Sequence, residues 1–196
     1  MNIIPSMAKE ENNLVSSIEN FFKKFGVGSI LKASNAYKEK GIPCREVFAL
    51  VFQLVFTGKT LFMNYELSSD SISFKKDVVY RFLNSTRIHW QRFLLLLSGK
   101  VINSHLKDLT GPDRINAFVV DDSFYGRTRS KAVELLSYVR DHADGNRSKK
   151  GFRMLTLGWT DGFSFVPVSF NLLSSTSKAN INPANPVDKR TAGYKR

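Results

Sequence analysis

Two adjacent carboxylates, Asp121 and Asp122, are the residues whose type and position most favour chemistry. They follow a short apolar run at residues 117–120, which predicts a strand that is buried on both faces and ends at the acidic pair. Carboxylate oxygens on a rigid strand are hard ligands that suit Mg²⁺ or Mn²⁺, and such an ion activates water and stabilises charge on a phosphate. A strand that simply ends in an acidic turn is the alternative, because one acidic pair does not complete a metal site.

Basic residues follow the acidic pair closely along the chain. The candidate DNA contacts among them are Arg127, Arg129, Lys131, Arg147, Lys149, Lys150 and Arg153. Guanidinium and ammonium groups hold the phosphates of a nucleic-acid backbone, which gives these residues a binding role in one interpretation. In the other interpretation they are ordinary surface charges on solvated loops. Tyr125, beside them, is a candidate for stacking on bases.

The remaining polar and aromatic candidates favour structural roles. The pair Asp161-Gly162 is typical of a two-residue hairpin turn, so we expect Asp161 to shape a turn rather than to bind a metal. Trp159 and Phe163 flank that turn and, although aromatic rings stack on bases, residues in such positions more often pack. The three histidines are His89, His105 and His142. Their spacing does not place two of them on one helix face, so it does not predict a zinc site.

The elements that must position these residues change character near residue 110. Up to about residue 109, apolar residues recur at helical spacing, for example Leu14, Ile18 and Phe22. The turn-forming cluster at residues 110–113 then ends this pattern. We therefore expect a helical N-terminal domain over residues 1–110, with a DNA-binding role suggested by its charge.

The second part of the chain, residues 111–196, shows strand patterns. After the strand at 117–120 we expect a helix over 131–140 and then two strands, around 154–159 and 163–170, joined as a hairpin. From about residue 174 the chain turns polar. The predicted fold class is α+β, and the three expected strands with one helix would leave a sheet with an open edge. This pattern predicts that the second domain is incomplete.

The composition narrows the possible classes of protein. The 29 Lys and Arg outnumber the 17 Asp and Glu, so the formal charge of +12 favours a polyanionic partner. Apolar residues make up 42% of the chain, enough for a buried core. The single cysteine, Cys44, suits a reducing compartment. The most apolar run, at residues 47–56, is shorter than the roughly 20 residues that span a bilayer, so we expect a cytoplasmic protein without membrane partners.

The order of these features resembles the front half of a bacterial insertion-sequence transposase of the DDE class. The resemblance covers about residues 113–176 well and the preceding helical region only in character. It rests on the apolar strand ending in Asp121-Asp122-Ser123, on Lys150-Gly151-Phe152, and on the segments 155–162, 165–168 and 172–175.

This resemblance implies an incomplete ribonuclease H-like domain with strand, helix and hairpin. In that family three acidic residues hold two metal ions, Mg²⁺ or Mn²⁺, for DNA strand cleavage and strand transfer. The family pattern of an Asp followed two residues later by Thr or Ser selects Asp121 with Ser123 as the first position, and Asp122 if the register slips by one. The second Asp and the Glu have no counterpart and are expected beyond Arg196, so the chain alone is predicted to be inactive.

The resemblance also implies double-stranded transposon ends as partner, together with a homo-oligomer or a full-length transposase, in the bacterial cytoplasm with the nucleoid. Two other hypotheses remain open. A non-catalytic basic protein would occupy transposon ends and regulate transposition. A helical interaction module would fold as residues 1–109 alone and ignore DNA.

Overall fold

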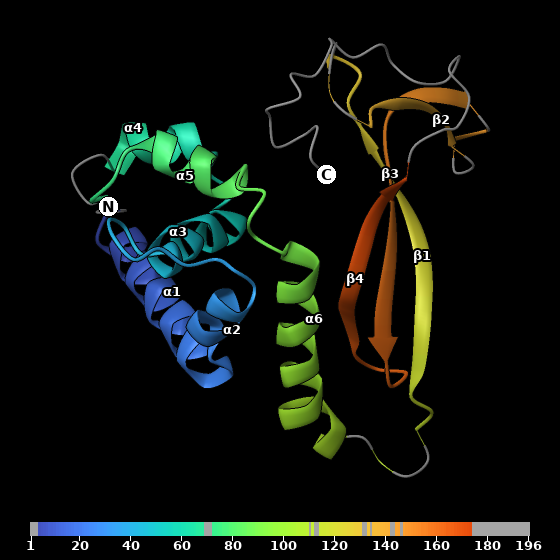
Figure 1. The fold of residues 1–196 in the computed structure, drawn as a ribbon, viewed down its shortest axis with the longest axis horizontal. Helices are drawn as coiled ribbons and strands as arrows, with labels where there is room; N and C mark the ends of the chain where they lie inside the picture. Colours follow the sequence, from blue (N-terminus) through green and yellow to red (C-terminus); the bar gives the residue numbers. More distant parts are fainter. Residues whose placement is uncertain are drawn as a thin grey trace. The chain divides into compact units, whose positions relative to one another are not determined.

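The computed structural model divides the chain into two compact units, Met1–Phe93 and Leu94–Arg196 (Figure 1). The structure describes residues 4–68, 72–109, 111, 114–130, 133, 135–141, 144–145 and 147–173. Helices come first and an antiparallel sheet follows, which confirms the predicted α+β class. The boundary between the two compact units, at residues 93 and 94, falls inside a helix. The predicted domain boundary at residue 110 stays a prediction.

The first unit is built from helices. Their bounds are α1 Ile4–Phe25, α2 Val27–Ala33, α3 Cys44–Thr57, α4 Leu61–Ser68 and α5 Lys76–Leu83. The helical spacing noted in the sequence puts Ile18, Phe22 and Phe25 on the buried side of α1. Phe22 stacks on Phe48 of α3 with a centroid distance of 5.7 Å. Aromatic packing between α1 and α3 thus forms much of this core.

The second unit begins within helix α6, Trp90–Val101. This helix continues into a π-helical turn, Ile102–Leu106, and a 3-10 turn, Lys107–Leu109. The strands are β1 Ala117–Gly126, β2 Ser137–Asp141, β3 Arg147–Thr160 and β4 Phe165–Leu173. Strand β3 pairs antiparallel with the other three, and Figure 1 shows it between β1 and β4.

Helix α6 and its π-helical extension pack on one face of this sheet. Ile102 forms a buried cluster with Trp159 of β3 and Val168 of β4. The Ser98 hydroxyl, almost fully buried, lies 2.6 Å from the Pro167 carbonyl oxygen and 2.7 Å from the Leu94 carbonyl oxygen, and donates its one proton to either of them. Trp159 is therefore a packing residue, as its place beside the turn suggested.

The helix expected over residues 131–140 is wrong where the structure describes this stretch. Residues 137–141 form strand β2 instead, with Tyr138 opposite Lys150 and Val139 opposite Lys149 of β3. Leu135 has a φ of 61°, in the left-handed region, which no regular helix contains. Pairing with the edge of β3 therefore overrides the helical spacing of the apolar residues.

The first strand also differs from its prediction. It runs on through the acidic pair to Gly126, so Asp121 and Asp122 lie in the middle of β1 rather than at its end. Its apolar residues are exposed, with Phe118 at 72% of its full accessible surface. A continuous apolar run predicts cover on both faces, but Val119 and Val120, which point to opposite faces, are both exposed.

The hairpin is present, but with a longer loop than Asp161-Gly162 predicts. Thr160 of β3 pairs with Phe165 of β4, so four residues, 161–164, connect the two strands.

No helix among the described residues is both long and apolar enough to cross a lipid bilayer.

Candidate functional site

The two acidic residues of β1 point to opposite faces of the sheet. Successive side chains of a strand alternate between faces, and the pairing of β1 with β3 is continuous over Ala117–Gly126, so nothing interrupts this alternation. Asp121 lies opposite Thr156, and Asp122 lies opposite Leu155. Leu157 and Trp159 share the face of Leu155, which is the face that α6 covers. Asp122 therefore belongs to the α6 face and Asp121 to the other.

On the α6 face, the Asp122 carboxylate is paired with a basic side chain. Its carboxylate forms an ion pair with Arg153 of the neighbouring strand β3, two residues from Leu155, the register partner of Asp122. Both side chains are roughly two-fifths exposed. The negative charge of Asp122 is thus already balanced by a guanidinium.

On the opposite face, Asp121 has an uncharged neighbour. The Ser123 hydroxyl, two residues along the same strand, donates a 3.4 Å hydrogen bond to Asp121 Oδ2. Asp121 is exposed, and the strand on which it sits is fixed by ten paired positions along β3. Its carboxylate therefore projects from a regular part of the sheet into solvent.

The chemistry of this small donor set fits a hard cation. A carboxylate and a hydroxyl are oxygen donors of the kind that Mg²⁺ and Mn²⁺ take, but they fill only part of a coordination sphere of about six oxygens. Within the described ranges, no group of three His, Cys, Asp or Glu side chains gathers as a metal site. Asp121 and Ser123 alone therefore do not complete a metal site.

The basic candidates lie on strands and turns rather than on one loop. Arg127 and Arg129 follow β1 and are exposed, and Lys131 lies outside the described residues. The other four are on β3, where a loop was one interpretation: Arg147, Lys149, Lys150 and Arg153. The structure therefore divides this basic set between strand β3 and the segment after β1.

The alternation of β3 separates these four by face. Arg147, Lys149 and Arg153 share the face of Asp122, whereas Lys150 is on the face of Asp121. Lys149 also forms an ion pair of 2.7 Å with Asp144. Lys150 is therefore the basic residue of β3 that shares a face with Asp121.

Two residues near the site were missed by sequence reasoning. Tyr138 and Arg140 belong to β2 and share the face of Asp121 and Lys150, because Tyr138 lies opposite Lys150 and Arg140 opposite Ser148. Their positions were assigned to a helix. The aromatic and β-branched Tyr138-Val139 pair was the signal that favoured a strand there.

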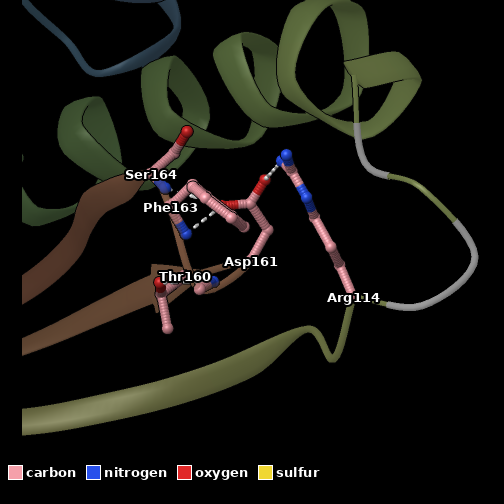
Figure 2. A network of polar contacts seen from close by, with 6 residues as sticks. Arg114, Thr160, Asp161, Phe163 and Ser164 are labelled. Atoms are coloured by element: carbon pink, nitrogen blue, oxygen red, sulfur yellow. Dashed lines mark hydrogen bonds and ion pairs between the residues drawn. The ribbon is translucent and has the colours of Figure 1, made fainter.

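Asp161 is a structural residue of the hairpin loop (Figure 2). Its Oδ1 accepts hydrogen bonds from the backbone N–H groups of Phe163, at 3.0 Å, and Ser164, at 2.6 Å. Its Oδ2 pairs with Arg114 Nη1 at 3.3 Å, and the same guanidinium lies 3.9 Å from the centre of the Phe163 ring. This network explains the buried carboxylate and leaves it no oxygen directed at a metal.

The same contacts perturb the ionisation of Asp161. The Ser164 N–H contributes most to lowering the pKa of this carboxyl, and the Phe163 N–H and the Arg114 guanidinium lower it further, while burial opposes them in part. The ionised form is therefore favoured in the folded protein. The assignment of Asp161 to a turn is confirmed.

The apolar hollow of the second unit is not an acidic site. It has a volume of about 600 Å³ and lies between the α6 region and the α6 face of the sheet. Its lining is Leu95, Gly99, Ile102, Asn103, Lys107, Asn116, Ala117, Phe118, Leu157, Trp159 and Val168. This set includes no carboxylate, so the hollow does not contain the chemistry of Asp121.

Comparison with protein families identifies the class to which this chain belongs. Residues 65–195 match the model of a family described as DDE superfamily endonuclease. The match covers two thirds of the sequence, and the chain therefore belongs to this family. The mixed α+β fold, with helices before an antiparallel sheet, is consistent with a partial ribonuclease H-like core. Neither the curated proteins nor the solved structures contain a match to this chain.

Proposed function

We propose that this chain is the N-terminal portion of a bacterial insertion-sequence transposase that cleaves and transfers DNA strands with a divalent metal. The observation that carries the proposal is the position of Asp121. It is an exposed carboxylate on a strand whose ten residues all pair with β3, within the region that matches the DDE endonuclease family. The charge of +12 supports a nucleic-acid partner and, with it, a location beside the bacterial nucleoid.

In this proposal Asp121 is the first metal ligand, and Ser123 orients its carboxylate. When bound, Mg²⁺ or Mn²⁺ would activate water and stabilise the charge that develops on the phosphate. Asp122, the alternative ligand, is supported less well because Arg153 already neutralises it on the other face of the sheet. We therefore do not assign Asp122 to the metal site.

The chain alone is expected to have little or no nicking activity. A two-metal clamp needs several carboxylates that converge on one point. Asp121 and Asp122 project from opposite faces of the sheet, so they cannot bind one cation together. Cleavage would require further acidic ligands on the face of Asp121.

Iron-directed backbone cleavage tests the metal site without requiring enzyme activity. Fe²⁺ would replace Mg²⁺ in the full chain, and ascorbate with peroxide would generate hydroxyl radicals at the bound ion. We expect cleavage of the polypeptide near β1 in the unmodified protein and in Asp122→Asn, and its loss in Asp121→Asn. Equal cleavage in Asp121→Asn would contradict the assignment of the ligand.

A plasmid-nicking assay with Mg²⁺ or Mn²⁺ tests the expected lack of activity. Nicking by the chain that disappears in Asp121→Asn would overturn the prediction of inactivity and would strengthen the assignment of Asp121. Nicking that persists in Asp121→Asn would point to a contaminating nuclease.

A second candidate function is regulation by occupying transposon ends. The exposed Arg127 and Arg129, with the basic residues of β3, favour this DNA-binding role without catalysis. It predicts a steep loss of DNA affinity with salt and a preference for one inverted-repeat sequence. Equal affinity for every duplex would leave only nonspecific attraction.

A further inference from the structure

Two exposed tyrosines share the sheet face that carries Asp121. Tyr125 lies four residues after Asp121 on β1 and opposite Phe152 of β3. Tyr138 of β2 lies opposite Lys150, two residues before Phe152 on the same strand. Because side chains two apart along a strand point to the same side, Asp121, Tyr125 and Tyr138 all belong to one face.

The register places these tyrosines around a basic centre. Gly151 of β3 pairs with Gly126 of β1 and with Ser137 of β2, so β1 and β2 lie along its two edges. Tyr125 and Tyr138 are therefore separated by about 10 Å across the strands and about 7 Å along them. Lys150 and Phe152 of β3 lie between the two tyrosines.

The exposure of these rings is suited to contact with a ligand. Tyr125 and Tyr138 retain 47% and 46% of their accessible surface, in contrast to Trp159 on the α6 face, which is buried. Arg140, also exposed, is on the same face as Tyr138. The face thus combines accessible aromatic rings with positive charge, the combination that binds single-stranded nucleic acid.

We propose that this face, defined by Tyr125, Tyr138, Lys150 and Arg140, binds unpaired DNA nucleotides and is here called the tyrosine face. Bases stack on the two tyrosine rings while Lys150 and Arg140 contact the phosphates. A duplex keeps the flat faces of its bases inside the stack, so only unpaired bases present them to the protein. The ligand is therefore a single-stranded stretch or an opened end of DNA.

The position of the tyrosine face relative to Asp121 suggests the path that a bound DNA strand would follow. Tyr125 is four positions along β1 from Asp121, which corresponds to about 13 Å at the usual rise per residue. An unpaired end held by the tyrosines would extend along the same face toward Asp121. This part of the inference rests on the proposed function, whereas preferential binding of single strands does not.

Fluorescence anisotropy of the full chain tests the preference. A labelled single-stranded oligonucleotide and the duplex of the same sequence would be titrated in parallel at fixed salt. We expect the Tyr125→Ala Tyr138→Ala variant to lose about tenfold or more of its single-strand affinity with little change for the duplex. The Tyr125→Phe Tyr138→Phe variant should retain binding, because phenylalanine rings still stack.

One control variant and one further variant of the tyrosine face sharpen this test. Tyr80→Ala removes a comparably exposed tyrosine from α5, in the other compact unit, and should leave the ratio of single-strand to duplex affinity unchanged. Lys150→Ala should weaken binding and reduce the slope of log affinity against log salt by roughly one. An unchanged ratio of single-strand to duplex affinity in the tyrosine-to-alanine variant would overturn the proposal.

Photocrosslinking keeps the proposal testable if the alanine variants do not fold. An oligonucleotide carrying 5-iodouracil would be irradiated with the unmodified protein and the adduct mapped by mass spectrometry. Adducts at Tyr125 or Tyr138 would support the tyrosine face, and adducts confined to other residues would overturn it. If the unmodified protein showed no iron-directed cleavage near β1 but kept its tyrosine-dependent binding, only the proposed metal site would be refuted.

Discussion

Arg153 and Asp122 form an ion pair on the face of the sheet opposite to Asp121. This relationship separates two carboxylates that are neighbours in the sequence. One of them has its charge balanced by a guanidinium, and the other is directed into solvent with a serine hydroxyl beside it. Adjacent positions on a strand therefore need not share a role.

The Asp122–Arg153 pair is expected to contribute little to stability. Because both side chains are about two-fifths exposed, solvent screens their attraction, and the coupling free energy should be no more than about 1 kcal/mol. A double-mutant cycle with Asp122→Asn and Arg153→Met, measured by urea unfolding, gives this value. A coupling of several kcal/mol would mean that the pair is far better shielded than its exposure indicates.

Asp161 should make the stability of the second unit sensitive to acid. Its pKa is lowered in the folded state, so its contribution is complete well above the ordinary value of 3.8 and is lost as the pH falls below that value through the folded pKa. We expect Asp161→Asn to lower the Tm at neutral pH and the two Tm values to converge toward pH 2. A difference in Tm that stays constant down to pH 2 would show that ionisation of Asp161 does not matter.

Ser98→Ala should loosen the contact between α6 and the sheet. The hydroxyl is 3% exposed and donates either to the Pro167 carbonyl or to the Leu94 carbonyl at 2.7 Å, since it has one proton. Its removal leaves the Pro167 carbonyl without this donor, at a cost of about 1–3 kcal/mol in free energy of unfolding. Ser98→Thr keeps the hydroxyl and serves as the matched control for Ser98→Ala in urea denaturation.

Two glycines of β3 should respond differently to replacement by alanine. A Cβ at Gly151 would lie 2.3 Å from the Tyr125 carbonyl oxygen, so the backbones of β1 and β3 would have to separate. A Cβ at Gly158 would meet the outer atoms of the Phe165 ring, which is exposed and can turn away. We expect Gly151→Ala to cost about 1–3 kcal/mol and Gly158→Ala clearly less.

Tryptophan fluorescence distinguishes these glycine variants. In a Trp90→Phe background, Trp159 on β3 is the remaining tryptophan and reports on the sheet. Urea unfolding of the full chain in this background would then compare Gly151→Ala with Gly158→Ala directly. Equal costs for the two would contradict the distinction between a backbone obstacle and a movable ring.

Local sequence signals predicted the parts of the fold that local chemistry determines. The hairpin around Asp161 follows from a turn dipeptide between two apolar segments, and the helical spacing of Ile18 and Phe22 gives α1. Strand β2 was missed because its apolar residues also fit a helix; the Tyr138-Val139 pair favours a strand only weakly, and pairing with the edge of β3 selects the extended form. Long-range pairing decided between two locally acceptable structures.

The candidate site was predicted by residue type but not by geometry. Asp121 and Asp122 stood out as a carboxylate pair, yet their separation onto opposite faces depends on β1 extending to Gly126. Tyr138 joined the face of Asp121 only once β2 was paired with β3. Residues that are brought together by the pairing of different strands are not related by any regular spacing in the sequence.

Helix α6 determines where a shortened polypeptide that contains the sheet should begin. A polypeptide beginning at the turn near residue 110 would contain every strand of the sheet but would lack Ser98 and Ile102, leaving Trp159 and Val168 uncovered. Beginning instead in the segment between α5 and α6, at residues 84–89, keeps that cover attached. An insoluble product from the first choice would then reflect the position of the cut rather than an inability of the sheet to fold.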